Sequence, residues 1–146
     1  MWFDPFVKLI LCSPLHGILS RNTMLLTFTG RRSGKEYTTP VNFFRVGEGN
    51  KETLLTTSRR ERTWWRNLRD SAEVHLLIGG KDFQASARAI EDPEEVVKGL
   101  SEILEAAPGI AKYFDVRLDQ NGKPAPQDLK QAAEPLVIVR SLISEE

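Results

Sequence analysis

Hydrophobic and polar residues alternate with a period of two along much of this chain, which is the pattern of half-buried β-strands. The clearest alternation covers residues 36–43, where Tyr37 and Val41 belong to the apolar set and Glu36 and Asn42 to the polar set. Pro40 has no N–H to donate to a ladder, so it marks an edge or a bulge in this run. We expect strands over residues 24–29, 36–46, 52–58, 73–79, 82–90 and 136–142.

Turn and helix signals separate these strands. Residues 47–50 and 79–82 are rich in glycine and predict hairpin turns. Asp92-Pro93 opens a helix with Glu95 at the capping-box position, and residues 106–109 end it. Thr63 is placed to cap a short helix over residues 64–69, and residues 115–128 have the composition of a loop. The pattern predicts a mainly β fold, a barrel or a sandwich with helices outside it, as one domain over residues 1–146.

An apolar helix is also expected near the N-terminus. Asp4-Pro5 has the form of an N-cap followed by proline at the first helical position, and Ser13-Pro14 ends the pattern. The helix carries the single cation Lys8, which favours packing on the domain or on a partner subunit over peripheral contact with a membrane. Apolar stretches are too short for a membrane span, and we find no signal-peptide pattern.

Composition narrows the classes of chemistry. The 146 residues are 40% hydrophobic and 27% charged, which is ordinary for a globular domain. The lone Cys12 excludes an internal disulfide, and with only His16 and His75 we expect no metal site. A reducing, cytoplasmic setting fits this composition best.

The net charge of zero is the sum of a basic segment and an acidic segment of the chain. Residues 21–69 carry eleven Lys and Arg against four Asp and Glu, whereas residues 70–146 carry eight against fifteen. The first segment therefore has a charge of +7 and the second −7. A basic segment attracts a polyanion, but we find no nucleic-acid-binding motif. The asymmetry favours a small, highly charged ligand, and a solvated basic face is the alternative.

The first candidate site lies in residues 29–40, which read TGRRSGKEYTTP. Glycines allow a sharp turn with exposed amide N–H groups, and Arg31, Arg32 and Lys35 would surround them with positive charge. The spacing fits neither the phosphate loop of nucleoside triphosphatases nor the dinucleotide-binding glycine motif. From the residues alone, an anion site and a basic hairpin turn remain equal alternatives.

The second candidate site lies in residues 57–68, which contain Trp64 and Trp65 at the start of the short helix. Two adjacent indoles cannot both face one core, so we expect one to pack inward and the other to lie near a pocket or an interface. Asn67, one turn after Trp64, offers a donor and an acceptor to a planar heterocycle. A packed tryptophan pair with solvated arginines is the alternative.

In these two segments the chain resembles the deazaflavin-dependent nitroreductases of the flavin and deazaflavin oxidoreductase superfamily. The resemblance covers residues 24–90 and rests on TGRRSGK at 29–35, TPV at 39–41, Thr57-Ser58 and WWRNL at 64–68. It implies a six-stranded split β-barrel with peripheral helices, often a homodimer. It also implies binding of coenzyme F-420, a deazaflavin whose tail carries a phosphate and several glutamate carboxylates.

The resemblance assigns roles by position. The resemblance implies that five residues of the first segment hold the phosphate and the neighbouring tail: Arg31, Arg32, Ser33, Gly34 and Lys35. Pro40 and Val41 would present backbone groups to the ring edge. The ring or ribityl region would be lined by Thr57, Ser58 and Arg59, and the cofactor would be bordered by Trp64 and Asn67.

The implied reaction is hydride transfer from the reduced deazaflavin to a quinone, an enone or a nitroaromatic compound, with no essential nucleophile in the protein. Tyr113 is the candidate residue on the substrate side, and a core or interface tyrosine is the alternative. The loop between Ser58 and Trp64 is shorter than in many relatives, and residues 117–131 are longer and more polar. Substrate and cofactor choice therefore stay open. An FMN-dependent enzyme of the same fold and a non-catalytic binder of a hydrophobic ligand are the other hypotheses.

Overall fold

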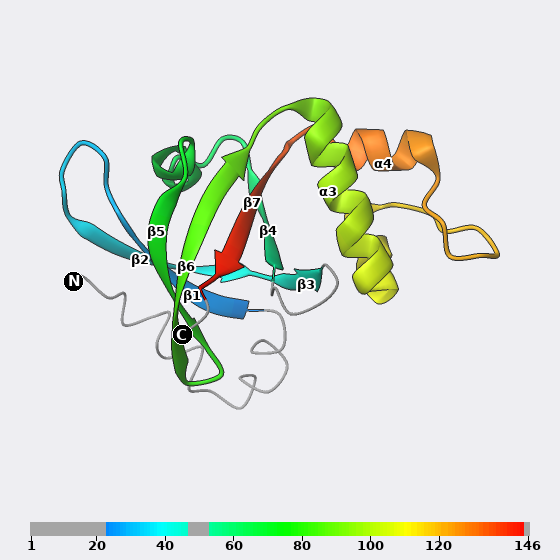
Figure 1. Ribbon diagram of the computed structural model, residues 1–146. Helices are drawn as coiled ribbons and strands as arrows, with labels where there is room; N and C mark the ends of the chain where they lie inside the picture. Colours follow the sequence, from blue (N-terminus) through cyan, green and yellow to red (C-terminus); the bar gives the residue numbers. More distant parts are fainter. Residues whose placement is uncertain (1–22, 47–52, 145–146) are drawn as a thin grey trace.

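The computed structural model describes residues 23–46 and 53–144 (Figure 1). Seven described strands form one curled antiparallel sheet in the order β2-β1-β5-β6-β7-β4-β3. Their bounds are β1 (Thr23–Thr29), β2 (Glu36–Asn42), β3 (Phe44–Val46), β4 (Thr53–Arg59), β5 (Ala72–Ile78), β6 (Lys81–Ile90) and β7 (Leu136–Ile143). The expected mainly β, split-barrel fold with peripheral helices is confirmed. The expected N-terminal helix and the turn at 47–50 lie outside the described residues.

The prediction of one strand over residues 36–46 is wrong, because the strand breaks at Phe43. β2 pairs with β1 at one edge of the sheet, whereas β3 pairs with β4 at the other edge. Within three residues the chain therefore passes between the two edges of the curled sheet. Asn42 fixes this crossing, because its Nδ2 donates to Thr57 Oγ1 at 2.7 Å and its Oδ1 accepts from Thr57 N at 2.9 Å.

Both faces of the sheet are buried along β4 and β7, which explains the continuous apolar run in β7. Val137 and Val139 point into the core inside the half-barrel, and Ile138 points into a second core beneath the helices. Phe43 and Phe44 likewise belong to different cores. Period-two alternation in these strands distributes apolar side chains to two interiors rather than to one.

α3 (Pro93–Ala106) and α4 (Pro126–Ala133) cover the outer face of the sheet at one end of the molecule (Figure 1). α3 begins as predicted, with the Asp92 carboxylate accepting from Glu95 N at 3.2 Å. It packs closely on β7 at Gly99, where a Cβ would lie 3.1 Å from Ile138. Two 3-10 helices, η1 (Trp64–Leu68) and η2 (Pro108–Phe114), flank the sheet and α3.

Two of the described helical segments, η2 and α4, were not predicted. α4 (Pro126–Ala133) begins inside the stretch that we expected to be a loop up to residue 128. Pro126 is a helix-start signal, but Ala125 at the N-cap makes no side-chain hydrogen bond, so the usual capping residue is missing. None of the helices in the described ranges is long and apolar enough to cross a membrane, and these ranges hold no cluster of three metal-ligating side chains.

Candidate functional site

The loop between β1 and β2 has a closed shape that its glycines make possible. Gly30 N donates to Lys35 O at 2.8 Å, and Gly34 N donates to Gly30 O at 2.9 Å. Gly34 has a φ of +69°, a conformation that favours glycine. The Ser33 hydroxyl accepts from Lys35 N at 3.2 Å and shares a hydrogen bond of 3.1 Å with the Tyr37 hydroxyl. The backbone and one side chain thus hold the loop from within.

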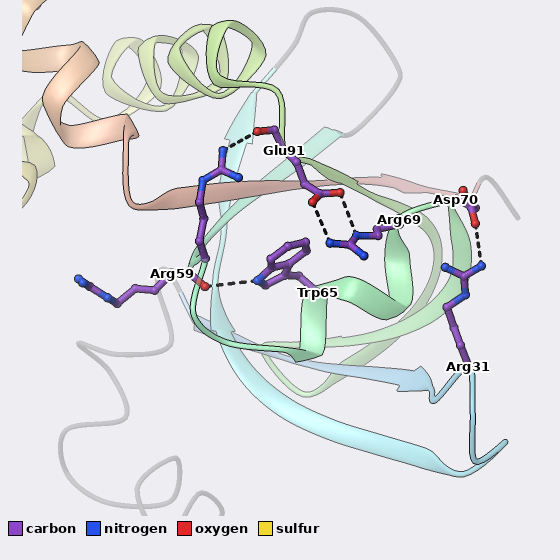
Figure 2. A network of polar contacts seen from close by, with 7 residues as sticks. Arg31, Arg59, Trp65, Arg69, Asp70 and Glu91 are labelled. Atoms are coloured by element: carbon purple, nitrogen blue, oxygen red, sulfur yellow. Dashed lines mark hydrogen bonds and ion pairs between the residues drawn. The ribbon is translucent and has the colours of Figure 1, made fainter.

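The three cations of this loop differ in their partners. Arg31 Nη2 lies 2.7 Å from Asp70 Oδ2, at the end of η1 (Figure 2). Within residues 23–46 and 53–144, the side chains of Arg32 and Lys35 make neither a hydrogen bond nor an ion pair. Among the described residues, the loop therefore presents two positive charges without an ion-pair partner and one that is compensated by a neighbouring carboxylate.

The loop is also fastened to η1 by Asn67. Its Oδ1 accepts from Arg31 N at 2.9 Å, and its Nδ2 donates to Trp64 O at 2.9 Å. A 3-10 helix has three residues per turn, so Trp64 and Asn67 lie along one side of η1, and Asp70 follows two residues after its end. Both polar groups of the Asn67 amide bind the backbone, so Asn67 borders the site by holding two walls together rather than by offering a free amide.

The two adjacent tryptophans divide as the sequence predicted. Trp65 is 3% exposed, lies in the core, and donates through Nε1 to Arg59 O at 3.3 Å (Figure 2). Trp64 is only partly buried and donates through Nε1 to Ser58 Oγ at 3.1 Å. Both indoles are therefore anchored to the end of β4, but only Trp64 presents a face to solvent.

Two hollows meet at Trp64. One, of about 840 Å³, combines cations and aromatic rings; its lining includes Phe28, Arg31, Arg32, Ser33, Tyr37, Arg66, Asn67 and Arg69. The other, of about 390 Å³, has fewer arginines; its lining includes Pro40, Val41, Asn42, Thr57, Ser58, Arg59, Arg62 and Leu136. Trp64 lines both. The arrangement offers an anion-binding cleft next to a smaller hollow with polar backbone and hydroxyl groups.

Comparison with protein families assigns the chain. Residues 14–114, more than half of the sequence, match the family described as F420H(2)-dependent quinone reductase. The chain belongs to this family. The resemblance to deazaflavin-dependent oxidoreductases is thereby confirmed, and the family is one of oxidoreductases that depend on reduced F-420. Curated protein sequences gave no match.

Solved structures agree on the fold. The heme storage protein HutZ from Vibrio cholerae is 13% identical with a TM-score of 0.52, covering 100% of this chain and 93% of that chain. A putative pyridoxamine 5'-phosphate oxidase from Listeria innocua is 18% identical with a TM-score of 0.51, covering 90% and 91%. An F420-H2 dependent reductase named FDR-A is 23% identical with a TM-score of 0.49, covering 85% and 95%. At these identities, HutZ and the oxidase show a shared fold alone.

In this member of the quinone reductase family, most of the residues expected at a cofactor site lie together. The cationic cleft contains Arg31, Arg32, Ser33, Trp64 and Asn67. The smaller hollow contains Pro40, Val41, Thr57, Ser58 and Arg59. Gly34 and Lys35 belong to the loop but line neither hollow. Tyr113 is 77% exposed on η2 and also lines neither.

Sequence reasoning missed several lining residues, among them one tyrosine and three arginines. Tyr37 faces Phe28 across β1 and β2, with ring centroids 5.7 Å apart. Arg66 and Arg69 follow Thr63 at intervals of three, a signal that depends on recognising η1 as a 3-10 helix. Arg62 lines the smaller hollow.

Arg69 is held in place rather than free. Its guanidinium donates twice to the Glu91 carboxylate, at 3.0 and 3.1 Å, and lies 5.2 Å from the ring centre of Trp65 (Figure 2). Arg60 in turn donates to the backbone oxygen of Glu91. The wall of the cleft is thus connected to the start of α3 through one glutamate.

Proposed function

We propose that this protein binds reduced coenzyme F-420 across the two hollows and transfers a hydride to an electrophilic small molecule such as a quinone, an enone or a nitroaromatic compound. The observation that carries the proposal is the junction at Trp64 of a cationic cleft and a less charged hollow. The cofactor has the same division, with a polyanionic tail at one end and a planar ring at the other.

The tail would lie on the loop between β1 and β2. Arg32 and Lys35 have no partner among the described residues, and Arg31 uses Nη2 for Asp70 and retains its other N–H donors. Charge-assisted hydrogen bonds of this kind contribute about 1.5–3 kcal/mol each before solvent screening is discounted. Two or three such contacts are enough to reach micromolar affinity when the ring adds its own burial.

The ring would lie in the smaller hollow beside Trp64. Here the side-chain amide of Asn42 is occupied by Thr57, and the Ser58 hydroxyl by Trp64 and Arg59 O. These groups are already satisfied, so they define a fixed wall without competing for the ring. The bound deazaflavin supplies the hydride, and the protein supplies orientation and exclusion of water.

Tyr113 remains our proposed residue on the substrate side. Since it is exposed and lines neither hollow, its role would require approach to the site of a second copy in the expected homodimer. In that arrangement, the Tyr113→Phe variant should lower kcat/KM for the electrophile without changing F-420 affinity. An unchanged kcat/KM would remove Tyr113 from the site.

The test of cofactor binding is a tryptophan-fluorescence titration with oxidised F-420 beside FMN in the same buffer, since Trp64 is a built-in reporter. Saturable quenching at low micromolar F-420, with a weaker response to FMN, is expected. Replacing Arg31, Arg32 and Lys35 together with alanine should weaken F-420 binding by about a hundredfold or more. A variant with Lys98, Lys112 and Lys123 changed to alanine removes the same charge elsewhere and should bind normally. Equal loss in both variants would contradict a tail site on this loop.

A further inference from the structure

Asp70 is a carboxylate beside the cationic cleft, paired with Arg31 of its lining, although the proposed ligand of this cleft is an anion. It extends from the end of η1 to Arg31, and the two charged groups lie 2.7 Å apart with exposed fractions of 77% and 51% (Figure 2). Asn67, one turn earlier, holds the backbone N–H of the same arginine. Arg31 is therefore held at two points, by Asn67 of η1 and by Asp70 just after η1.

This arrangement places the carboxylate next to any anion that Arg31 binds. A guanidinium has five N–H donors in a planar fork, and Asp70 occupies one edge through Nη2. A phosphate on the remaining donors would lie roughly 6 Å from the Asp70 carboxylate, given ordinary hydrogen-bond lengths. Repulsion between the two grows in proportion to the charge that the phosphate carries at that point.

We propose that Asp70 is a specificity-determining residue that favours a phosphodiester over a terminal phosphomonoester at this cleft. The inference rests on the proposed function, in which the loop holds the phosphate of the cofactor. A phosphomonoester such as that of FMN carries a charge of about −1.5 to −2 at neutral pH. The phosphodiester of F-420 carries one negative charge, and its further carboxylates lie along the tail, where neither Arg32 nor Lys35 pairs with a carboxylate of residues 23–46 and 53–144.

The substitution Asp70→Asn separates charge from geometry. The asparagine oxygen can still accept a hydrogen bond from Arg31, so the orientation of the guanidinium is kept while the negative charge is removed. If Asp70 only positioned Arg31, the affinities for both ligands would stay at their wild-type values. If the charge of Asp70 discriminates between the ligands, the substitution must raise the affinity for FMN more than the affinity for F-420, and this difference must become smaller as the salt concentration rises.

The experiment measures dissociation constants of F-420 and FMN by calorimetry for wild type and Asp70→Asn, in 0.1 M and in 1 M sodium chloride. We expect the preference for F-420 over FMN to fall about three- to tenfold in the variant at low salt, and this change to disappear at 1 M. Asp82→Asn removes one charge at the opposite end of β5 and β6 and should leave the preference unchanged.

Different results would overturn the proposed function and the proposed role of Asp70. Wild-type protein that binds neither ligand, or that prefers FMN, would overturn the proposed function itself. Wild-type protein that prefers F-420, with the same preference in Asp70→Asn, would overturn only the role of Asp70. A preference that changes equally at both salt concentrations would also overturn it, because the effect would then not be electrostatic.

Discussion

Gly30 shows at the scale of one residue how the loop depends on close contacts. A Cβ at this position would lie 2.8 Å from Ser33 Oγ and 2.8 Å from Tyr37 Cε2. The variant Gly30→Ala should therefore displace the loop and weaken F-420 binding about tenfold, the effect of an overpacked site worth roughly 1–3 kcal/mol. Calorimetric titration checks it, and Gly109→Ala, with nothing within 4 Å of its added Cβ, is the matched control.

Replacing each tryptophan with alanine should affect a different property: stability for Trp65 and ligand affinity for Trp64. Trp65 is buried in the core, so Trp65→Ala should lower the free energy of unfolding by about 3–5 kcal/mol. Trp64 is partly buried between the two hollows, so Trp64→Ala should reduce ligand affinity with a smaller loss of stability. Urea unfolding and calorimetric binding measure the two effects separately. Loss of binding in Trp65→Ala alone, at unchanged stability, would contradict the assignment.

The sequence predicted which residues belong to the candidate site, but it did not predict the partners of their side chains. Arg31 and Asn67 stand 36 positions apart, and no local pattern says that the amide of one will hold the backbone of the other. Asn67 was expected to offer its amide to a heterocycle, whereas both of its polar groups are occupied. Asp70 was not expected at the site at all. Side-chain partners are set by tertiary contacts, which periodicity does not record.

At the scale of elements, strand periodicity predicted where the chain is extended but not which partner it chooses. The alternation over residues 36–43 continues through the break at Phe43, because both β2 and β3 bury apolar side chains. The break becomes visible only when β2 is paired with β1 and β3 with β4. α4 was missed for a related reason, since its eight residues bury only Leu129 and Ala133.

The crossing between the two edges of the sheet should depend on Asn42. Its side chain exchanges two hydrogen bonds with Thr57, and its backbone oxygen accepts from Thr56 Oγ1 at 2.8 Å. In Asn42→Ala the amide N–H of Thr57 loses its partner, so the free energy of unfolding should fall by about 1–3 kcal/mol. Urea unfolding gives this value. Stability equal to that of wild type would mean that water replaces the amide without cost.

The segment before α4 should be sensitive to acid. Hydrogen bonds from the Arg117 guanidinium and the Arg117 N–H hold the pKa of the Asp128 carboxyl below its usual value. A carboxyl with a lowered pKa in the folded state stabilises it above about pH 4 and loses that contribution as pH falls further. The protection factors of the amides in residues 117–125, which are their exchange rates corrected for the intrinsic rate at each pH, should therefore fall below pH 4, and Asp128→Asn should have low protection factors already at pH 7. Wild-type protection factors that stay constant from pH 7 to pH 3 would contradict this.

At the scale of the whole molecule, the charge asymmetry of the sequence becomes a division in space. The basic loop and η1 lie toward one end of the sheet, and α3, with Glu94, Glu95, Glu102 and Glu105, lies at the other (Figure 1). At the basic end, Asp70 pairs with Arg31 and Glu91 pairs with Arg69. The local excess of positive charge is therefore smaller than the count of charged residues in the sequence indicates. The sequence predicted the sign of this surface, and the ion pairs determine its strength.

This division predicts how salt acts on binding. The screening length falls from about 10 Å at 0.1 M salt to about 3 Å at 1 M, so contacts between exposed Arg and Lys side chains and a polyanionic tail should weaken strongly. We expect F-420 affinity to fall about tenfold or more over this range. The deazaflavin chromophore without its phosphate tail should bind more weakly but with nearly constant affinity, since burial of the ring beside Trp64 depends little on ionic strength. Parallel salt titrations of the two compounds test this. If both compounds showed the same salt dependence, the tail would not bind to the loop between β1 and β2. The proposed site would then be reduced to the hollow beside Trp64, where the ring binds.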